Sequence, residues 1–158
     1  MLLTSPRFIL RYARPMSRYR IEGSCHCGNV SYVFDASQSV EAMGLRACQC
    51  SFCRAHGART TSDPNGAMRF KIHDREKLQR YRFGLKTADF LICRACGVFV
   101  GALMTEDGRN YVTVNANTFK PPPAYDIIAV AKNFAAEDVA ERTSRRSAMW
   151  TPVTEFLE

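Results

Sequence analysis

Seven cysteines carry the most distinctive chemistry in this sequence, and they fall into three short motifs. The motifs are Cys25-x-Cys27, Cys48-x-Cys50-x-x-Cys53 and Cys93-x-x-Cys96. Cysteines at such spacing can turn their sulfurs toward one ion, which is typical of zinc sites. Four thiolates close the shell of a structural zinc, whereas three leave a position for water or substrate. The count of seven therefore divides naturally into one site of each kind.

The first and last motifs form the natural group of four ligands, because a glycine, Gly28 or Gly97, follows each and permits close backbone approach. Three alternatives remain: a redox CxxC pair, buried cysteines without metal, and a disulfide framework. A redox pair usually accompanies a thioredoxin-like βαβ pattern, which we do not find. Disulfides are rare in intracellular proteins, and this chain has the features of one. A closed site of four cysteine thiolates is the favoured interpretation.

The middle motif is compact enough for Cys48, Cys50 and Cys53 to reach a single ion. His56 is near enough to be a fourth ligand or a proton-transfer group, but a nearby histidine is more often a polar neighbour, and the leading alternative is an open position. Three thiolates on Zn²⁺ leave a net charge of about −1, which favours a soft fourth ligand. A substrate thiol meets that requirement, because coordination would deprotonate it into a nucleophile.

Basic and polar residues around the middle motif are candidates for substrate contact. Arg46, Arg54 and Arg59 either receive the carboxylates of an acidic thiol or are solvated surface charges. Gln49, Arg54 and His56 are the weak candidates for substrate binding. The chain lacks the H-x-E and P-C-x-x-C pair of zinc deaminases and the paired histidines of nucleic-acid fingers.

The elements that must position these motifs are predicted to be mainly β-strands. Alternating or apolar runs predict strands at 30–34, 68–72, 78–83, 98–104 and 111–114. Asp107-Gly108 predicts a hairpin between the strands at 98–104 and 111–114. The Cys93-x-x-Cys96 turn leads directly into the first of these strands. The best helix candidate spans 135–149, with acidic residues early and arginines late.

Length and charge indicate one domain with a basic start. The 158 residues are about the size of a single domain. The formal charge of +7 falls to +2 without the five arginines that precede Glu22, so nucleic-acid binding is not expected of the body. No run is apolar enough for a membrane span, and no secretory signal is evident. We expect a cytoplasmic protein with a zinc-binding β domain at 21–120 and a C-terminal extension at 121–158 whose helix packs on that domain. The basic leader at 1–20 is expected to be disordered or extra sequence.

Three motifs in order carry a family resemblance that spans about Gly23 to Phe119. They are Gly23-Ser24-Cys25-His26-Cys27-Gly28, Cys48-Gln49-Cys50-Ser51-Phe52-Cys53-Arg54 and Cys93-Arg94-Ala95-Cys96-Gly97. This pattern resembles the glutathione-dependent formaldehyde-activating (GFA) family, also called the CENP-V/GFA domain family. The resemblance implies a complex β-roll of antiparallel sheets with zinc knuckles and two zinc ions per chain. It also implies that Cys25, Cys27, Cys93 and Cys96 hold the structural zinc, and Cys48, Cys50 and Cys53 the catalytic zinc.

The resemblance further implies a carbon-sulfur lyase that joins a small thiol and a small aldehyde, in the named case glutathione and formaldehyde, to S-hydroxymethylglutathione. Two departures bear on the substrate: Gln49 stands where many relatives carry histidine, and Asn117-Thr118-Phe119 replaces a Gly-(Thr/Ser)-Leu-Asp-like segment. The alternative is a non-enzymatic zinc-stabilised module, either a thiol carrier or a docking protein, since some relatives resemble centromere protein V. In the docking version, the leader and Arg142, Arg145 and Arg146 would form a basic face.

Overall fold

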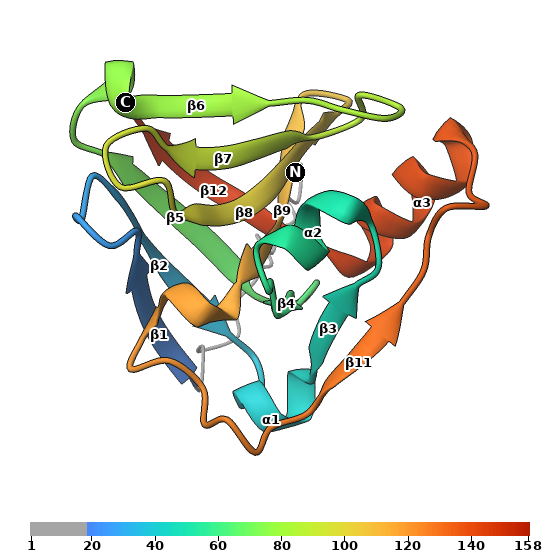
Figure 1. The fold of residues 1–158 in the computed structure, drawn as a ribbon, viewed down its shortest axis with the longest axis horizontal. Coiled ribbons are helices and arrows are strands. Elements are labelled where there is room, and N and C mark those ends of the chain that lie inside the picture. The colour runs from blue at the N-terminus through green and yellow to red at the C-terminus, as the bar shows by residue number, and fades with distance from the viewer. Residues whose placement is uncertain (1–18) are drawn as a thin grey trace, which may run out of the picture.

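The computed structural model describes residues 19–158, and Figure 1 shows their fold. The basic leader expected at 1–20 lies outside the described residues except for its last two. Of these, Arg20 is part of the first strand and forms ion pairs of 3.7 Å with Glu22 and 4.0 Å with Asp35.

The described residues form one curled sheet of twelve strands with few helices. The strands are β1 (Tyr19–Ser24), β2 (Val30–Ala36), β3 (Leu45–Cys48), β4 (Thr60–Thr61), β5 (Ala67–Ile72), β6 (Leu78–Tyr81), β7 (Asp89–Cys93), β8 (Phe99–Glu106), β9 (Arg109–Asn115), β10 (Phe119–Lys120), β11 (Ala129–Lys132) and β12 (Thr151–Leu157). The helices are α1 (Val40–Met43), α2 (Ser51–Ala55) and α3 (Val139–Met149), with 3₁₀ turns η1 (Arg75–Lys77) and η2 (Ala116–Thr118). The prediction of a mainly β fold with one short C-terminal helix is confirmed.

Strand β9 is the point at which the sheet branches. The main path runs β10-β1-β2-β5-β12-β9-β4-β3-β11, and β8, β7 and β6 continue from the other edge of β9. Most neighbours are antiparallel, as expected, but β12 pairs with β5 and β11 with β3 in parallel. These two parallel pairs were not predicted, because their partners are distant in sequence and each joins through a long connection.

The predicted hairpin is present as β8 and β9, with Glu106 opposite Arg109 across the Asp107-Gly108 turn. Both turn residues have positive φ, 48° and 71°, which matches the right-handed twist of a tight hairpin and suits Asp-Gly. The predicted C-terminal helix begins later than expected, at Val139 instead of residue 135. Asp138 sets this start because it is the N-cap and forms a capping box with Glu141.

Strand β8 separates the main core from the middle cysteine motif. Six consecutive β8 residues, from Phe99 to Met104, are buried. Val100 and Leu103 belong to the main core, whereas Phe99 packs in a smaller cluster with Cys53 and Ala58. A continuous apolar run is what a strand covered on both faces requires, so β8 provides the rigid wall behind this motif.

Among the helices of residues 19–158, none is both long and apolar enough to serve as a membrane span.

Candidate metal centre

The sulfurs of Cys25, Cys27, Cys93 and Cys96 come together from two turns that are far apart in the chain. All four Sγ atoms lie within 4.8 Å of one another. The Sγ of Cys27 is 3.7 Å from that of Cys25 and 3.5 Å from that of Cys93. Tetrahedral zinc with Zn–S bonds of about 2.3 Å needs sulfurs roughly 3.8 Å apart. The donor set therefore fits zinc.

The two turns that present this group of four have the same backbone design. In the first, the Cys25 amide donates to Val30 and the Gly28 amide to the Cys25 carbonyl. In the second, the Cys93 amide donates to Val98 and the Gly97 amide to the Cys93 carbonyl. Both glycines have positive φ, 83° and 73°, which explains why glycine follows each pair. The group joins the β1–β2 turn to the β7–β8 turn.

Burial and hydrogen bonding give the thiols of the group of four different acidities. Burial raises the pKa of Cys25 to about 12. Burial also acts to raise the pKa of Cys96, but backbone hydrogen bonds from Cys27 and Val98 outweigh it and lower that pKa to about 6. A metal ion would displace the remaining protons as it binds.

The middle motif forms the second group, in which Cys48, Cys50 and Cys53 place their Sγ atoms within 4.8 Å of one another. Cys48 ends β3, Cys50 is the N-cap of α2, and Cys53 is buried inside that helix. The Cys50 sulfur accepts the Cys53 amide at 3.4 Å, so helix formation itself fixes the spacing of two sulfurs. Among the described residues, no further His, Asp, Glu or Cys joins this group.

A hydrogen bond between the thiols of Cys48 and Cys53 shifts their pKa values in opposite directions. The side chain of Cys53 donates to Cys48, which lowers the pKa of Cys48 to about 5. The same bond, together with burial, raises the pKa of Cys53. A group of three thiols that already contains a thiolate-forming member is suited to a soft divalent ion.

His56 lies beside the second group but is oriented away from ligation. Its Nδ1 is 2.9 Å from the carbonyl oxygen of Phe52, and its ring packs 4.2 Å from the Phe52 ring. The structure therefore does not bring His56 into the ligand set.

The second group opens into a cavity of about 300 Å³. Cys48, Gln49 and Cys50 line one part of it, Phe83, Phe90 and Phe134 supply aromatic walls, and Arg142, Arg145 and Arg146 come from α3. A smaller recess of about 60 Å³ continues past Cys48 and Cys53 to Arg46. Two wider hollows, of about 490 and 550 Å³, lie elsewhere, one across β1, β2 and β5 and one beside Cys27. Of these four hollows, which are lined by residues within 19–158, the cavity and its recess combine a cysteine group with aromatic walls, so they are the better candidates for a reaction site.

Of the flanking residues expected to contact substrate, some line the cavity or its recess and others do not. Gln49 lines the cavity, and its amide donates to the Ala47 carbonyl at 2.8 Å. Arg46 lines the recess and donates to Ser62 and Thr113. Arg54 is exposed on α2 and does not line the cavity.

Arg59 and Asn117 bind each other away from the cavity. The Arg59 Nε donates to the Asn117 side chain at 2.7 Å, and the Asn117 amide donates to the Gly57 carbonyl at 3.0 Å. Asn117 therefore holds the turn that follows α2, and none of Asn117-Thr118-Phe119 lines the cavity.

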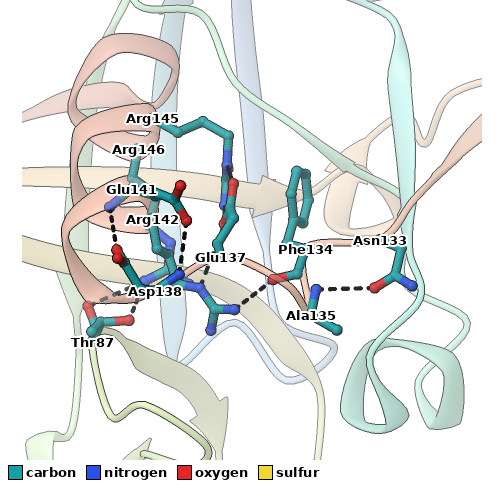
Figure 2. Close-up of polar contacts among 10 residues, drawn as sticks. All are labelled: Thr87, Asn133, Phe134, Ala135, Glu137, Asp138, Glu141, Arg142, Arg145 and Arg146. Atoms are coloured by element: carbon teal, nitrogen blue, oxygen red, sulfur yellow. Dashed lines mark hydrogen bonds and ion pairs between the residues drawn. The ribbon is translucent and has the colours of Figure 1, made fainter.

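The arginines of α3 are the part of the site that sequence reasoning missed. The alternative docking hypothesis placed them on a basic face, but Arg146 is only 8% exposed and all three line the cavity. Figure 2 shows them among Thr87, Phe134 and Glu137. The available signal was their spacing, because positions 142, 145 and 146 share one face of a helix. Sequence alone did not show what that face covers.

Comparisons with known proteins agree with this arrangement. The model of the family described as "Glutathione-dependent formaldehyde-activating enzyme" matches residues 20–134. A crystal structure of a Rhodobacter sphaeroides protein is 29% identical, with a TM-score of 0.53, and the match covers 70% of this chain and 97% of that one. No curated protein matches. Since the family model spans both cysteine groups and most of the sheet, the chain belongs to the glutathione-dependent formaldehyde-activating (GFA) family.

Proposed function

We propose that this protein is a zinc-dependent enzyme that adds a small thiol to a small aldehyde, with glutathione and formaldehyde as the first pair to test. One observation carries the proposal: within the group of three cysteines, which has metal-ligand geometry, Cys48 and Cys50 line a cavity of about 300 Å³ with aromatic walls, and Cys48 and Cys53 line its recess. In this proposal Cys25, Cys27, Cys93 and Cys96 hold a structural zinc, and Cys48, Cys50 and Cys53 hold a catalytic one. The reverse reaction is that of a carbon-sulfur lyase.

The reaction is a single addition of a thiol to a carbonyl group. The thiol sulfur forms a bond to the carbonyl carbon, the C=O π bond breaks, and the oxygen takes a proton, so that one thiol and one aldehyde give one S-hydroxyalkyl adduct. When bound, zinc would supply a soft Lewis acid that lowers the pKa of a thiol at its open position. Cys48, Cys50 and Cys53 would hold that ion beside the cavity and its recess.

The surrounding residues would then select and position the reactants. Phe83, Phe90 and Phe134 line the cavity with aromatic surface, which excludes water and limits competing hydration of the aldehyde. Phe90 also packs edge-on against Phe52 at 4.8 Å, so this wall is held by the same helix that carries Cys53. The arginines favour negatively charged reactants and a developing alkoxide.

The test is an exchange measurement of S-hydroxymethylglutathione formation by NMR, because the adduct also forms spontaneously. The zinc-loaded protein should accelerate exchange beyond the spontaneous rate at equal free glutathione, and Cys48→Ser should abolish the acceleration. A zinc-loaded protein that leaves the exchange rate at the spontaneous value would refute the enzyme. If it only lowers free glutathione, it is a thiol carrier.

A further inference from the structure

Helix α3 lies beyond the segment that the family model matches, which ends at residue 134. It nevertheless supplies Arg142, Arg145 and Arg146 to the cavity that Cys48 and Cys50 line. A cavity wall contributed by this helix is a candidate for what distinguishes this chain's substrate.

One of the three arginines is neutralised within the protein. Glu137 accepts from Arg145 through both carboxylate oxygens, at 2.5 and 2.8 Å. The Arg145 guanidinium also lies 3.8 Å from the centre of the Phe134 ring. This pairing, visible in Figure 2, locks Arg145 in place and satisfies its charge.

Arg146 has no such partner. Its Nη1 donates to the carbonyl and hydroxyl oxygens of Thr87, and its guanidinium lies over the Trp150 ring at 4.6 Å. Its Nε is buried without a hydrogen-bond partner. Within residues 19–158, no carboxylate lies within 4.0 Å of it. An arginine that is only 8% exposed normally has an ionic partner, because a buried unpaired charge is costly.

Arg142 is only partly satisfied. Its Nη2 donates to the Phe134 carbonyl at 2.6 Å, whereas its Nε is buried without a hydrogen bond, 3.5 Å from Glu137. Glu137 is already held by Arg145, so it cannot fully neutralise both. Two guanidinium groups of one helix face therefore retain unused donors beside the cavity.

Zinc at the three cysteines would not remove this surplus of positive charge. Three thiolates on Zn²⁺ contribute a net charge of about −1. Arg46, Arg142 and Arg146 all line the cavity or its recess, and none has its charge fully matched by a carboxylate of the described chain. The remaining positive charge favours an anion from outside the protein, and a planar guanidinium is best matched by a carboxylate.

We propose that α3 forms a carboxylate-binding subsite, in which Arg142 and Arg146 bind the carboxylate of a small thiol whose sulfur reaches Cys48, Cys50 and Cys53. This inference rests on the proposed function and names its substrate class: thiols that carry a carboxylate within reach of the sulfur. Arg145, whose charge is matched by Glu137, is not assigned to the carboxylate.

The experiment is isothermal titration of the zinc-loaded full chain with ω-mercaptocarboxylates, from mercaptoacetate to 6-mercaptohexanoate, each compared with the ω-mercaptoalcohol of equal length. At the best length, the carboxylate should bind at least about tenfold more tightly than the alcohol. Arg146→Gln should reduce this preference to less than about threefold. Because Arg146 is buried, Arg142→Gln is the parallel variant, and it should give the same direction of change. Arg54→Gln removes an equal charge from an exposed site beside the same motif and should leave the preference intact.

The possible results distinguish failure of the carboxylate subsite from failure of the proposed function. Equal affinities for acids and alcohols, or a preference unchanged in both Arg142→Gln and Arg146→Gln, would overturn the subsite but leave thiol binding in place. Binding of neither thiol to the zinc-loaded chain would overturn the proposed function as well. Glyoxylate binding that depends on Arg146, without any preference among thiols, would assign the carboxylate to the aldehyde and refute the thiol assignment.

Discussion

The group of four cysteines should stabilise the fold much more than the group of three, and the difference can be estimated from how much chain each would cross-link. Cys27 and Cys93 are 66 positions apart, and they join turns from the two branches of the sheet. Cys48 and Cys53 lie within one short segment that includes α2. The test compares Cys27→Ser/Cys96→Ser with Cys48→Ser/Cys50→Ser. None of these four cysteines is fully buried, so packing losses are small in both.

If a metal cross-link restricts the unfolded chain as a disulfide does, closing the longer loop contributes about 4 kcal/mol and closing the shorter one about 2 kcal/mol. For a domain of this size, these values correspond to Tm decreases of roughly 8–16 °C and 4–8 °C. Thermal melts followed by circular dichroism, with zinc content measured on the same samples, provide the comparison. A Cys27→Ser/Cys96→Ser variant that lacks one zinc yet melts with the wild type would refute the structural role, as would the reverse order of the two variants.

Three other predictions test separate parts of the structure. Gly101→Ala should lower the free energy of unfolding by about 1–3 kcal/mol, measured by chemical denaturation. The reason is that the new Cβ would lie 2.8 Å from the Thr113 carbonyl oxygen of the paired strand. An unchanged denaturation midpoint would show that β8 and β9 can separate there. The pKa of Glu137 is held below its usual 4.5, chiefly by the Arg145 hydrogen bond, so its contribution to stability is present above pH 4.5 and is lost as pH falls through the lowered value. Glu137→Gln should therefore show a shallower loss of Tm on acidification than wild type, and parallel acid profiles would contradict the pairing. Chelation should remove about two zinc ions per chain, the group lining the cavity losing its ion first; simultaneous loss of both would contradict two independent sites.

The cysteine groups could be predicted from sequence because their information is local. Spacing within each motif and the glycines after Cys27 and Cys96 dictate turns that present sulfurs together, and the structure brings the seven into the expected sets of four and three. The β8–β9 hairpin could also be predicted from sequence, since Asp107-Gly108 specifies a tight turn between apolar runs.

The features that sequence did not reveal depend on contacts between distant segments. Strand β12 inserts between β5 and β9, parallel to one and antiparallel to the other, and no local pattern in Thr151–Leu157 specifies those partners. That insertion follows directly after α3 and helps to fix where the helix lies. The cavity wall of Arg142, Arg145 and Arg146 is therefore a consequence of topology, and their helical spacing shows that they share a face but not what that face covers.

Cobalt substitution tests the central claim most directly, that Cys48, Cys50 and Cys53 hold a metal with a position open to a thiol. With cobalt in both cysteine groups, glutathione should increase the sulfur-to-cobalt charge-transfer absorption, as a fourth sulfur joins the group of three. The increase should be absent in Cys48→Ser and preserved in Arg54→Gln. A fully loaded protein whose spectrum is unchanged by saturating glutathione would contradict the account.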